Sequence, residues 1–205
     1  MPDTQTAPKR APYIVGFGGA FSHNSQTERL LSAVLHEAGQ LGAQTRLFSG
    51  RDLATLPHYD PVDSYRTPEQ VAFLEAISQA DGIVIATPTY HGGISALVKN
   101  AIDLVSDLRK DERPYFDGRA VGIVVTAGGG QGAGATLSGV RDIVHALRGW
   151  PTPIGVAVNT SVIFDEQGQI LSTSLKDAIA TQARQLVEFH LLKREAIRED
   201  ISAAV

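Results

Sequence analysis

The stretch of sequence that decides the fold is DGIVIATPTYHGG, residues 81–93, which continues into ISALVKNAID, residues 94–103. Residues 82–86 form a short apolar run with the length and β-branched content of a buried parallel strand. A turn-rich segment with one proline and two adjacent glycines follows, and an amphipathic helix comes directly after it. The loop at residues 87–93 is therefore predicted at the carboxyl end of a central strand, where open α/β sheets bind ligands.

Apolar runs alternate with helical patterns along the rest of the chain. Runs at residues 12–18, 43–48, 120–126 and 154–158 predict four further strands, with helices between the strands. Strands that alternate with helices pair in parallel through right-handed crossovers. Five such strands favour an α/β fold of the flavodoxin-like type, a three-layer sandwich with a five-stranded parallel sheet of order 2-1-3-4-5.

One connection in this pattern is unusually long. Residues 49–66 contain two prolines and show no clear period, so they are predicted to be irregular. Thr67, Pro68 and Gln70 then give the pattern of a helix start, with threonine as the N-cap and proline in the first position.

The domain organisation follows from the two ends of the chain. Residues 1–11 are polar and proline-rich, with no apolar centre, so they are predicted to be a disordered tail and not a signal peptide. Residues 12–205 are predicted to form a single domain, whose last helix begins at about Ser174.

Composition narrows the classes of protein to which the chain can belong. The net charge of −4 argues against a general nucleic-acid binder, and no apolar run approaches the roughly 20 residues that span a membrane. The chain has no cysteine, which removes disulfides, thiolate catalysis and cysteine-held iron–sulfur clusters. No histidine spacing predicts a metal site. Redox chemistry would need an organic cofactor or a cysteine-free metal site, and we expect a cytoplasmic protein.

Three loops are brought together by the predicted strand order. Strands 1, 3 and 4 are neighbours in the sheet, so the loops at their carboxyl ends, residues 18–27, 87–93 and 127–134, should meet. These loops are also the richest in glycine, hydroxyl and amide groups, which makes their common edge the predicted ligand site.

The first of these loops has the chemistry of a phosphate site. It lies at a helix N-terminus, where free backbone N–H groups and the helix dipole attract an anion. Its hydroxyl and amide side chains can add hydrogen bonds: Ser22, Asn24, Ser25, Gln26 and Thr27. A simple helix cap is the alternative, but a cap explains one of these residues and not all five.

The second and third loops suit a planar ligand. In the second, Pro88, Thr89, Tyr90, His91 and Gly92 combine a fixed φ, a close backbone approach and an aromatic ring. Taken alone, His91 is more often a surface histidine. In the third, the backbone N–H groups can stabilise negative charge on a reduced ring, as an oxyanion hole does. Its candidate residues are Gly128, Gly129, Gly130 and Gln131.

A dinucleotide site is the minority alternative. Residues 130–135 fit the G-x-G-x-x-A fingerprint, but they follow the fourth strand and lack the acidic partner about 20 residues further on. Arg51, after the second strand, could suit the 2′-phosphate of NADP.

Residues 80–103 and TAGGGQ, residues 126–131, resemble the NADPH-dependent FMN reductase family. The resemblance extends from the first strand to about residue 165, and its most specific part is the P-x-Y loop followed by the L-K-N-A-x-D type of helix. The first loop departs from the family pattern G-S-x-R-x-x-S-x-T: Ser25 and Thr27 match its end, but its arginine is replaced.

The resemblance implies how a flavin would be bound and used. FMN would lie between the three loops, with its phosphate on residues 22–27 and its ring against residues 88–92 and 128–131. Hydride would pass from NADPH or NADH to flavin N5, which is chemistry of the cofactor, so no catalytic side chain is predicted. Electrons would go to a flavin-dependent monooxygenase or to a quinone, azo compound or metal ion. Members are commonly homodimers or homotetramers, and residues 51–66 and 94–108 would supply the interface.

Two other kinds of protein stay open as alternatives. One is a non-enzymatic FMN electron carrier of the flavodoxin type, and the other is a regulatory or assembly protein that keeps the fold. Flavodoxins are usually more acidic and hold the ring between aromatic side chains, so a net charge of −4 and 6% aromatic residues disfavour the carrier.

Overall fold

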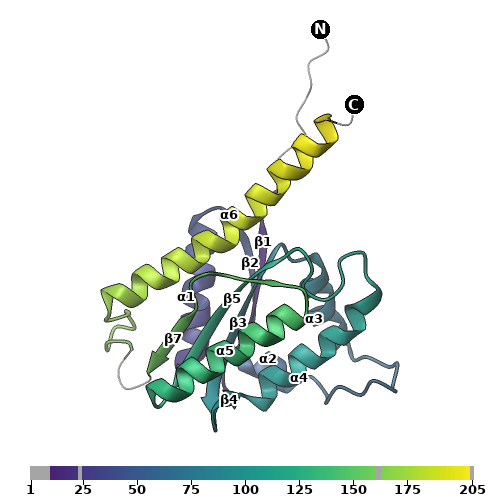
Figure 1. The fold of residues 1–205 in the computed structure, drawn as a ribbon. Helices are drawn as coiled ribbons and strands as arrows, with labels where there is room; N and C mark the ends of the chain where they lie inside the picture. Colours follow the sequence, from purple (N-terminus) through teal and green to yellow (C-terminus); the bar gives the residue numbers. More distant parts are fainter. Residues whose placement is uncertain (1–9, 23–24, 160–162, 204–205) are drawn as a thin grey trace.

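The computed structural model describes residues 10–22, 25–159 and 163–203, and these form one parallel α/β sheet with helices on both faces (Figure 1). The sheet has the order β2-β1-β3-β5-β6, and β7 also pairs with β5. Its parallel strands are β1 (Tyr13–Gly18), β2 (Gln44–Phe48), β3 (Gly82–Tyr90), β5 (Ala120–Ala127), β6 (Trp150–Pro151) and β7 (Val156–Asn159). The predicted order 2-1-3-4-5 is confirmed, with the fifth position divided between β6 and β7.

Two hydrophobic cores form because alternate residues of each strand point to opposite faces of the sheet. On β3, Ile83 and Ile85 belong to one core, whereas Val84 and Ala86 belong to the other. The first core packs under α2 (Gly50–Ala54), α3 (Pro68–Gln79), α4 (Ala96–Leu104) and α5 (Gly130–Ala146). The second packs under α1 (Gln26–Gln40) and α6 (Thr173–Ala203). Central strands covered on both sides explain the nearly continuous apolar runs in the sequence.

Hydrogen-bonded caps fix where several helices begin. Thr67 and Gln70 form the predicted capping box of α3, with Pro68 in its first turn. The prediction for residues 49–66 is wrong in part, because α2 lies there. Ser49 and Asp52 form a second capping box, and Leu53 is buried against the first core. The S-x-x-D spacing is the sequence signal that could have predicted α2.

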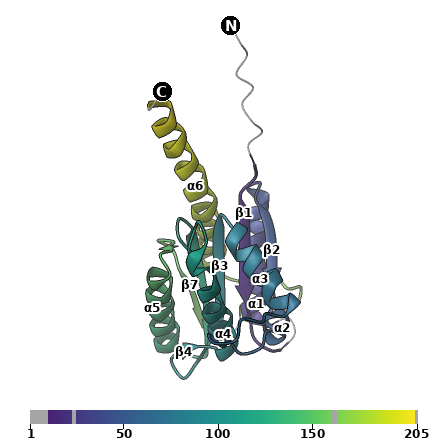
Figure 2. The same cartoon turned by 90° about the vertical axis from the view of Figure 1, so that its right-hand side faces the viewer.

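The last helix, α6, begins at Thr173, next to the predicted start, and is 31 residues long. Its first half packs on the sheet, and its carboxyl-terminal end projects beyond the amino ends of the strands in both views (Figures 1 and 2). The short β4 (Gly93–Ile94) lies at the opposite end of the molecule. The two ends of the sheet are therefore built from different segments.

The amino-terminal prediction concerns residues that mostly lie outside the described ranges. Residues 1–9 of the predicted tail are not described, and Arg10 forms an ion pair with Asp81. The single-domain boundary at residue 12 stays a prediction. None of the described helices combines the length and the apolar character that a membrane crossing requires.

Candidate functional site

The carboxyl ends of β1, β3 and β5 are joined by hydrogen bonds between residues far apart in the sequence. The hydroxyl oxygens of Thr27 and Thr126 lie 2.6 Å apart, although 99 residues separate them in the chain. The amide of Gly19 donates to the carbonyl of Ala86 over 3.1 Å. A Cβ at Gly18 would lie 1.8 Å from the same carbonyl oxygen, so only glycine fits there. The three predicted loops therefore meet at one edge of the sheet.

The first loop uses part of its polar chemistry on itself. Ser25 is the N-cap of α1, and its hydroxyl accepts hydrogen bonds from the amides of Glu28 and Ala20, both over 3.2 Å. Thr27 is buried and shares its hydroxyl with Thr126. Ser22 is exposed, and Asn24 lies outside the described residues. The helix-cap interpretation thus holds for Ser25, and the phosphate role of the loop stays a prediction.

Two kinds of group in this loop are left for a ligand. Apart from the Glu28 amide, which donates to the Ser25 hydroxyl, the first amides of α1 have no acceptor within the helix, because the first N–H groups of any helix lack one. The side-chain oxygen Oε1 of Gln26 is buried and has no hydrogen-bond partner among the described residues. A buried amide group without a partner is costly, so a polar ligand with hydroxyl groups would complete this position.

The bond between Thr27 and Thr126 gives a direct test of how the loop is held. Thr27→Val should lower the free energy of unfolding by about 1–3 kcal/mol, because it leaves the Thr126 hydroxyl buried without a partner. The double variant Thr27→Val with Thr126→Val should be more stable than the sum of the single changes predicts. Urea unfolding of the two single variants and the double variant measures this coupling, and strictly additive effects would contradict it.

The second loop, predicted as a turn-rich segment, is a β-hairpin with a tight turn at its tip. β3 continues through Pro88 to Tyr90, and β4 returns antiparallel to it, with Thr89 opposite Ile94. His91 and Gly92 make the connection with φ angles of 53° and 80°, as a type I′ turn requires. The strand tolerates Pro88 because β1 ends opposite Ala86, which leaves β3 with β5 as its parallel neighbour there.

The hairpin is fixed to its neighbours by threonine side chains. The Thr87 hydroxyl accepts a hydrogen bond from the Ser95 amide over 3.0 Å, next to the start of α4. The Thr89 hydroxyl donates to that of Thr136 on α5 over 3.1 Å. The side chain of Tyr90 is 56% exposed, so its ring is available at the surface. His91 is also exposed, as expected for a surface histidine in a turn, and the flavin role of the hairpin stays a prediction.

The third loop is shorter than predicted, because α5 begins at Gly130. Only Gly128 and Gly129 precede the helix, and Gln131 lies in its first turn. The apolar helical pattern begins only at Leu137, and a glycine-rich start disfavours a helix, so periodicity alone placed the boundary too late.

The start of α5 presents uncapped backbone to the shared edge. Gly129 is the N-cap residue, and no side chain caps the first turn. The amides there carry the positive end of the helix dipole. A Cβ added at Gly128, Gly129 or Gly130 would meet no protein atom within 4 Å. The packing of the protein therefore does not require glycine at these three positions, whereas close approach of a ligand would.

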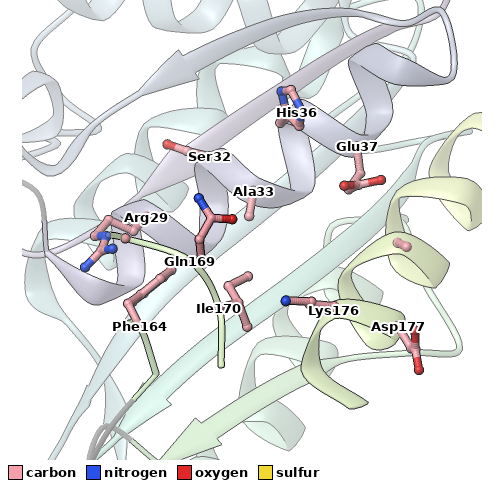
Figure 3. A pocket seen from close by; sticks show the side chains of 12 residues that line it. Arg29, Ser32, Ala33, His36, Glu37, Phe164, Gln169, Ile170, Lys176 and Asp177 are labelled. Atoms are coloured by element: carbon pink, nitrogen blue, oxygen red, sulfur yellow. The ribbon is translucent and has the colours of Figure 1, made fainter. Parts of the chain in front are cut away.

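A separate cavity of about 680 Å³ lies between α1, α6 and the segment from Phe164 to Ile170 (Figure 3). Arg29 lies over the Phe164 ring, 3.6 Å from its centroid. Charged side chains of both signs line the cavity, among them Lys176 and Asp177. No predicted cofactor-binding residue among those described lines it, so it is distinct from the edge where the three loops meet.

Comparison with known proteins identifies the family. Residues 12–162 match the family model described as NADPH-dependent FMN reductase. An iron-sulfur flavoprotein of Archaeoglobus fulgidus is 29% identical over 61% of the chain, and the match spans 66% of that relative. An NAD(P)H-dependent FMN reductase of Pseudomonas aeruginosa is 29% identical, and the match covers 84% of the chain and 92% of that relative. The present chain has no cysteine, so it cannot hold an iron–sulfur cluster through cysteine thiolates.

Solved structures share the fold. The flavoenzyme NAD(P)H:(acceptor) oxidoreductase of Paracoccus denitrificans superposes with a TM-score of 0.67 at 16% identity, covering 88% of this chain and 97% of that one. A WrbA-like flavodoxin of Agrobacterium tumefaciens gives a TM-score of 0.59 at 17% identity, with 89% and 99% covered. These likenesses confirm the flavodoxin-like architecture. The family match covers most of the chain, so the protein belongs to the NADPH-dependent FMN reductase family and is an oxidoreductase that works with FMN and NAD(P)H.

Proposed function

We propose that FMN binds where the carboxyl ends of β1, β3 and β5 meet. The observation that carries this is the open glycine surface at Gly128–Gly130, which lies next to hydrogen-bonded loops from the two other strands. The phosphate would lie on the first turn of α1, among Ser22 to Thr27, and the ring would lie between the hairpin and the start of α5. The buried, unpartnered Gln26 amide supports a polyhydroxylated chain between these two positions.

When bound, FMN supplies the redox chemistry, accepting a hydride and passing electrons on. The chain supplies binding and electrostatics. Amides at the start of α1 hold the phosphate, and amides at the start of α5 favour negative charge at the polar edge of the ring. The rigid hairpin sets the position of Tyr90, whose exposed ring covers the flavin and limits access of water.

We assign the donor and acceptor by chemical class. FMN held at this edge would take a hydride at flavin N5 from NADPH or NADH. Its electrons would go to a small acceptor such as a quinone, azo compound or metal ion, or to a flavin-dependent partner. The solvent-facing hairpin supports an acceptor that approaches from outside.

We also propose that the protein forms a homo-oligomer. Val62 and Tyr65 are 90% and 70% exposed in the connection before α3, where apolar side chains have no contact within the chain that buries them. Arg66 holds this connection in place through an ion pair with Asp107. A second copy of the chain that covers this surface would give a homodimer. A further contact between two dimers would give a homotetramer.

Turnover in the presence of FMN tests the function. Addition of FMN to the purified protein should quench flavin fluorescence, and oxidation of NADPH or NADH should then follow, measured by the loss of nicotinamide absorbance. FMN binding without oxidation of either nucleotide would favour an electron carrier of the flavodoxin type. A chain that binds no flavin would contradict both the reductase and the carrier.

A further inference from the structure

A small cavity lies at the opposite edge of the sheet from the three loops. It has a volume of about 190 Å³ and is lined by Asp81, Arg113, Gly118, His190, Lys193 and Arg194. Asp81 directly precedes β3, and Gly118 lies just before β5, which begins at Ala120. The cavity therefore lies at the amino ends of these two strands. His190, Lys193 and Arg194 of α6 supply the other wall. This helix runs on beyond the amino ends of the strands (Figure 1).

The one carboxylate that lines this cavity is already neutralised. Both carboxylate oxygens of Asp81 accept a hydrogen bond from Arg10 over 2.8 Å. The amide of Tyr13 adds a third hydrogen bond over 2.9 Å. The charge of Asp81 is therefore not available to balance the other cations around the cavity.

Those cations are held by backbone carbonyl groups instead of carboxylates. Arg113 donates to the Ser78 carbonyl over 2.9 Å, and Arg194 donates to the Arg10 carbonyl over 3.0 Å. Lys193 donates to the Gly118 carbonyl over 3.2 Å. Among the described residues, none of the three has a carboxylate within ion-pair distance. Each of these side chains is held by a hydrogen bond to a carbonyl group, and no ion pair with another described residue compensates its charge.

Buried Arg119 adds a fourth positive charge behind this wall. Its guanidinium is fully buried and donates to the carbonyls of Ala80, Tyr115 and Ser78 over 2.9, 3.0 and 2.6 Å. Burial, reinforced by the nearby charge of Arg113, lowers the pKa of Arg119 to about 10, so the group stays charged at neutral pH. Four basic side chains therefore gather at this end of the sheet on a chain whose net charge is −4, although Asp81, Asp111 and Asp117 also act on Arg119.

His190 supplies an independent sign of a missing ligand. Its Nδ1 lies 3.4 Å from Asp81, and its side chain is only 11% exposed. Its Nε2 is buried and has no hydrogen-bond partner among the described residues. Buried polar atoms nearly always have a partner. With Nδ1 facing the Asp81 carboxylate, the protonated ring would donate through Nε2 to an acceptor from outside the chain.

We propose that this cavity binds one inorganic oxyanion of the phosphate and sulfate class. Guanidinium and ammonium groups form charge-assisted hydrogen bonds to such an anion, and partial burial strengthens them. The volume suits a single tetrahedral anion and is smaller than the usual site for a nucleotide-sized ligand. Asp111 and Glu112 line the neighbouring cavity, so a larger phosphorylated molecule that extended there would meet carboxylates. A free anion fits better.

Calorimetric titration with sulfate tests the site, in chloride buffers of equal ionic strength. Sulfate should bind saturably to the chain, and saturating FMN, which fills the other anion site, should leave this binding unchanged. Lys193→Gln with Arg194→Gln should weaken sulfate binding by about tenfold or more. Lys176→Gln with Arg184→Gln removes two charges from the same helix outside this cavity and should change nothing. A phosphate monoester should bind at least tenfold more weakly than inorganic phosphate.

Several outcomes would overturn the proposal. Sulfate that shows no saturable binding, or that FMN displaces, would contradict it. So would two double variants that lose the same amount of sulfate affinity, or a phosphate monoester that binds as tightly as inorganic phosphate. FMN is added only in the competition experiment. If the chain bound no flavin, the sulfate titration without FMN would still test the anion site. Circular dichroism of each variant would check that its fold is kept.

The pH dependence of sulfate binding gives a second readout. His190 faces Asp81, Arg10, Arg113 and Arg194, and its burial lowers its pKa, so it is neutral at neutral pH. A bound dianion favours the protonated ring, so affinity should rise about threefold to tenfold as pH falls from about 7.5 to about 5.5. Sulfate keeps its charge over this range. His190→Gln should remove the rise, and an unchanged rise would contradict a role for this side chain.

Discussion

Gly129→Val should reduce FMN affinity by about 100-fold, or about 2.7 kcal/mol, while the apoprotein stays folded. A Cβ at this position meets no protein atom within 4 Å, and the backbone has extended angles of φ −155° and ψ 149°, which valine adopts readily. The loss would arise because a branched side chain occupies the space in which the flavin edge approaches the amides of α5. Apoprotein stability should fall by about 1 kcal/mol, since an N-cap prefers glycine to valine.

Fluorescence titration with FMN and thermal unfolding of the apoprotein measure the two parts of this expectation. Gly139→Ala is the matched control, because a Cβ there also meets nothing within 4 Å but lies further along α5. It should keep wild-type affinity and raise helix stability slightly. If Gly129→Val bound FMN as tightly as the wild type, the ring would not lie against this loop.

Arg119→Met should destabilise the fold by at least about 3 kcal/mol. The guanidinium is fully buried and donates to carbonyls before β3 and before β5, including those of Ser78, Ala80 and Tyr115. Methionine fills much of the same volume but has no donor, so several buried carbonyl groups would lose their partners at once. Urea denaturation measures the change in the free energy of unfolding.

An exposed arginine nearby provides the control for this effect. Arg109→Met removes the same charge from a side chain whose contact to the Ser106 carbonyl is exposed and 3.5 Å long. Its stability should change by less than about 0.5 kcal/mol. If Arg119→Met were equally mild, water or a neighbouring side chain would be satisfying the carbonyls in its place.

The order of the sheet could be predicted because it depends on local patterns. Alternating apolar runs and helical spacing give parallel strands, and the glycine-rich segments at their carboxyl ends follow from strand order. The contacts of Thr27 with Thr126 and of Thr89 with Thr136 link the first two predicted loops to the end of β5 and to α5, which flank the third predicted loop.

The details of the site depend on pairing between distant segments, which a single sequence does not reveal. β3 extends to Tyr90 because Thr87 and Pro88 pair with Val125 and Thr126 of β5, and this extension sets the register of the hairpin. The partner of Thr27 lies 99 residues away, and that of Asp81 lies 71 residues away. The start of α5 was also hidden, because three glycines among its first five residues contradict helix propensity and the sheet overrides it.

The division of the fifth strand between β6 and β7 has a consequence for how copies of the chain behave at high concentration. An uninterrupted strand at the edge of a sheet is a template for pairing with another chain and for aggregation. Here Pro151 and Pro153 remove two backbone donors, and the break between β6 and β7 limits each edge segment to 2 and 4 residues. The short edge segments therefore make this side of the sheet a poor template for strand addition.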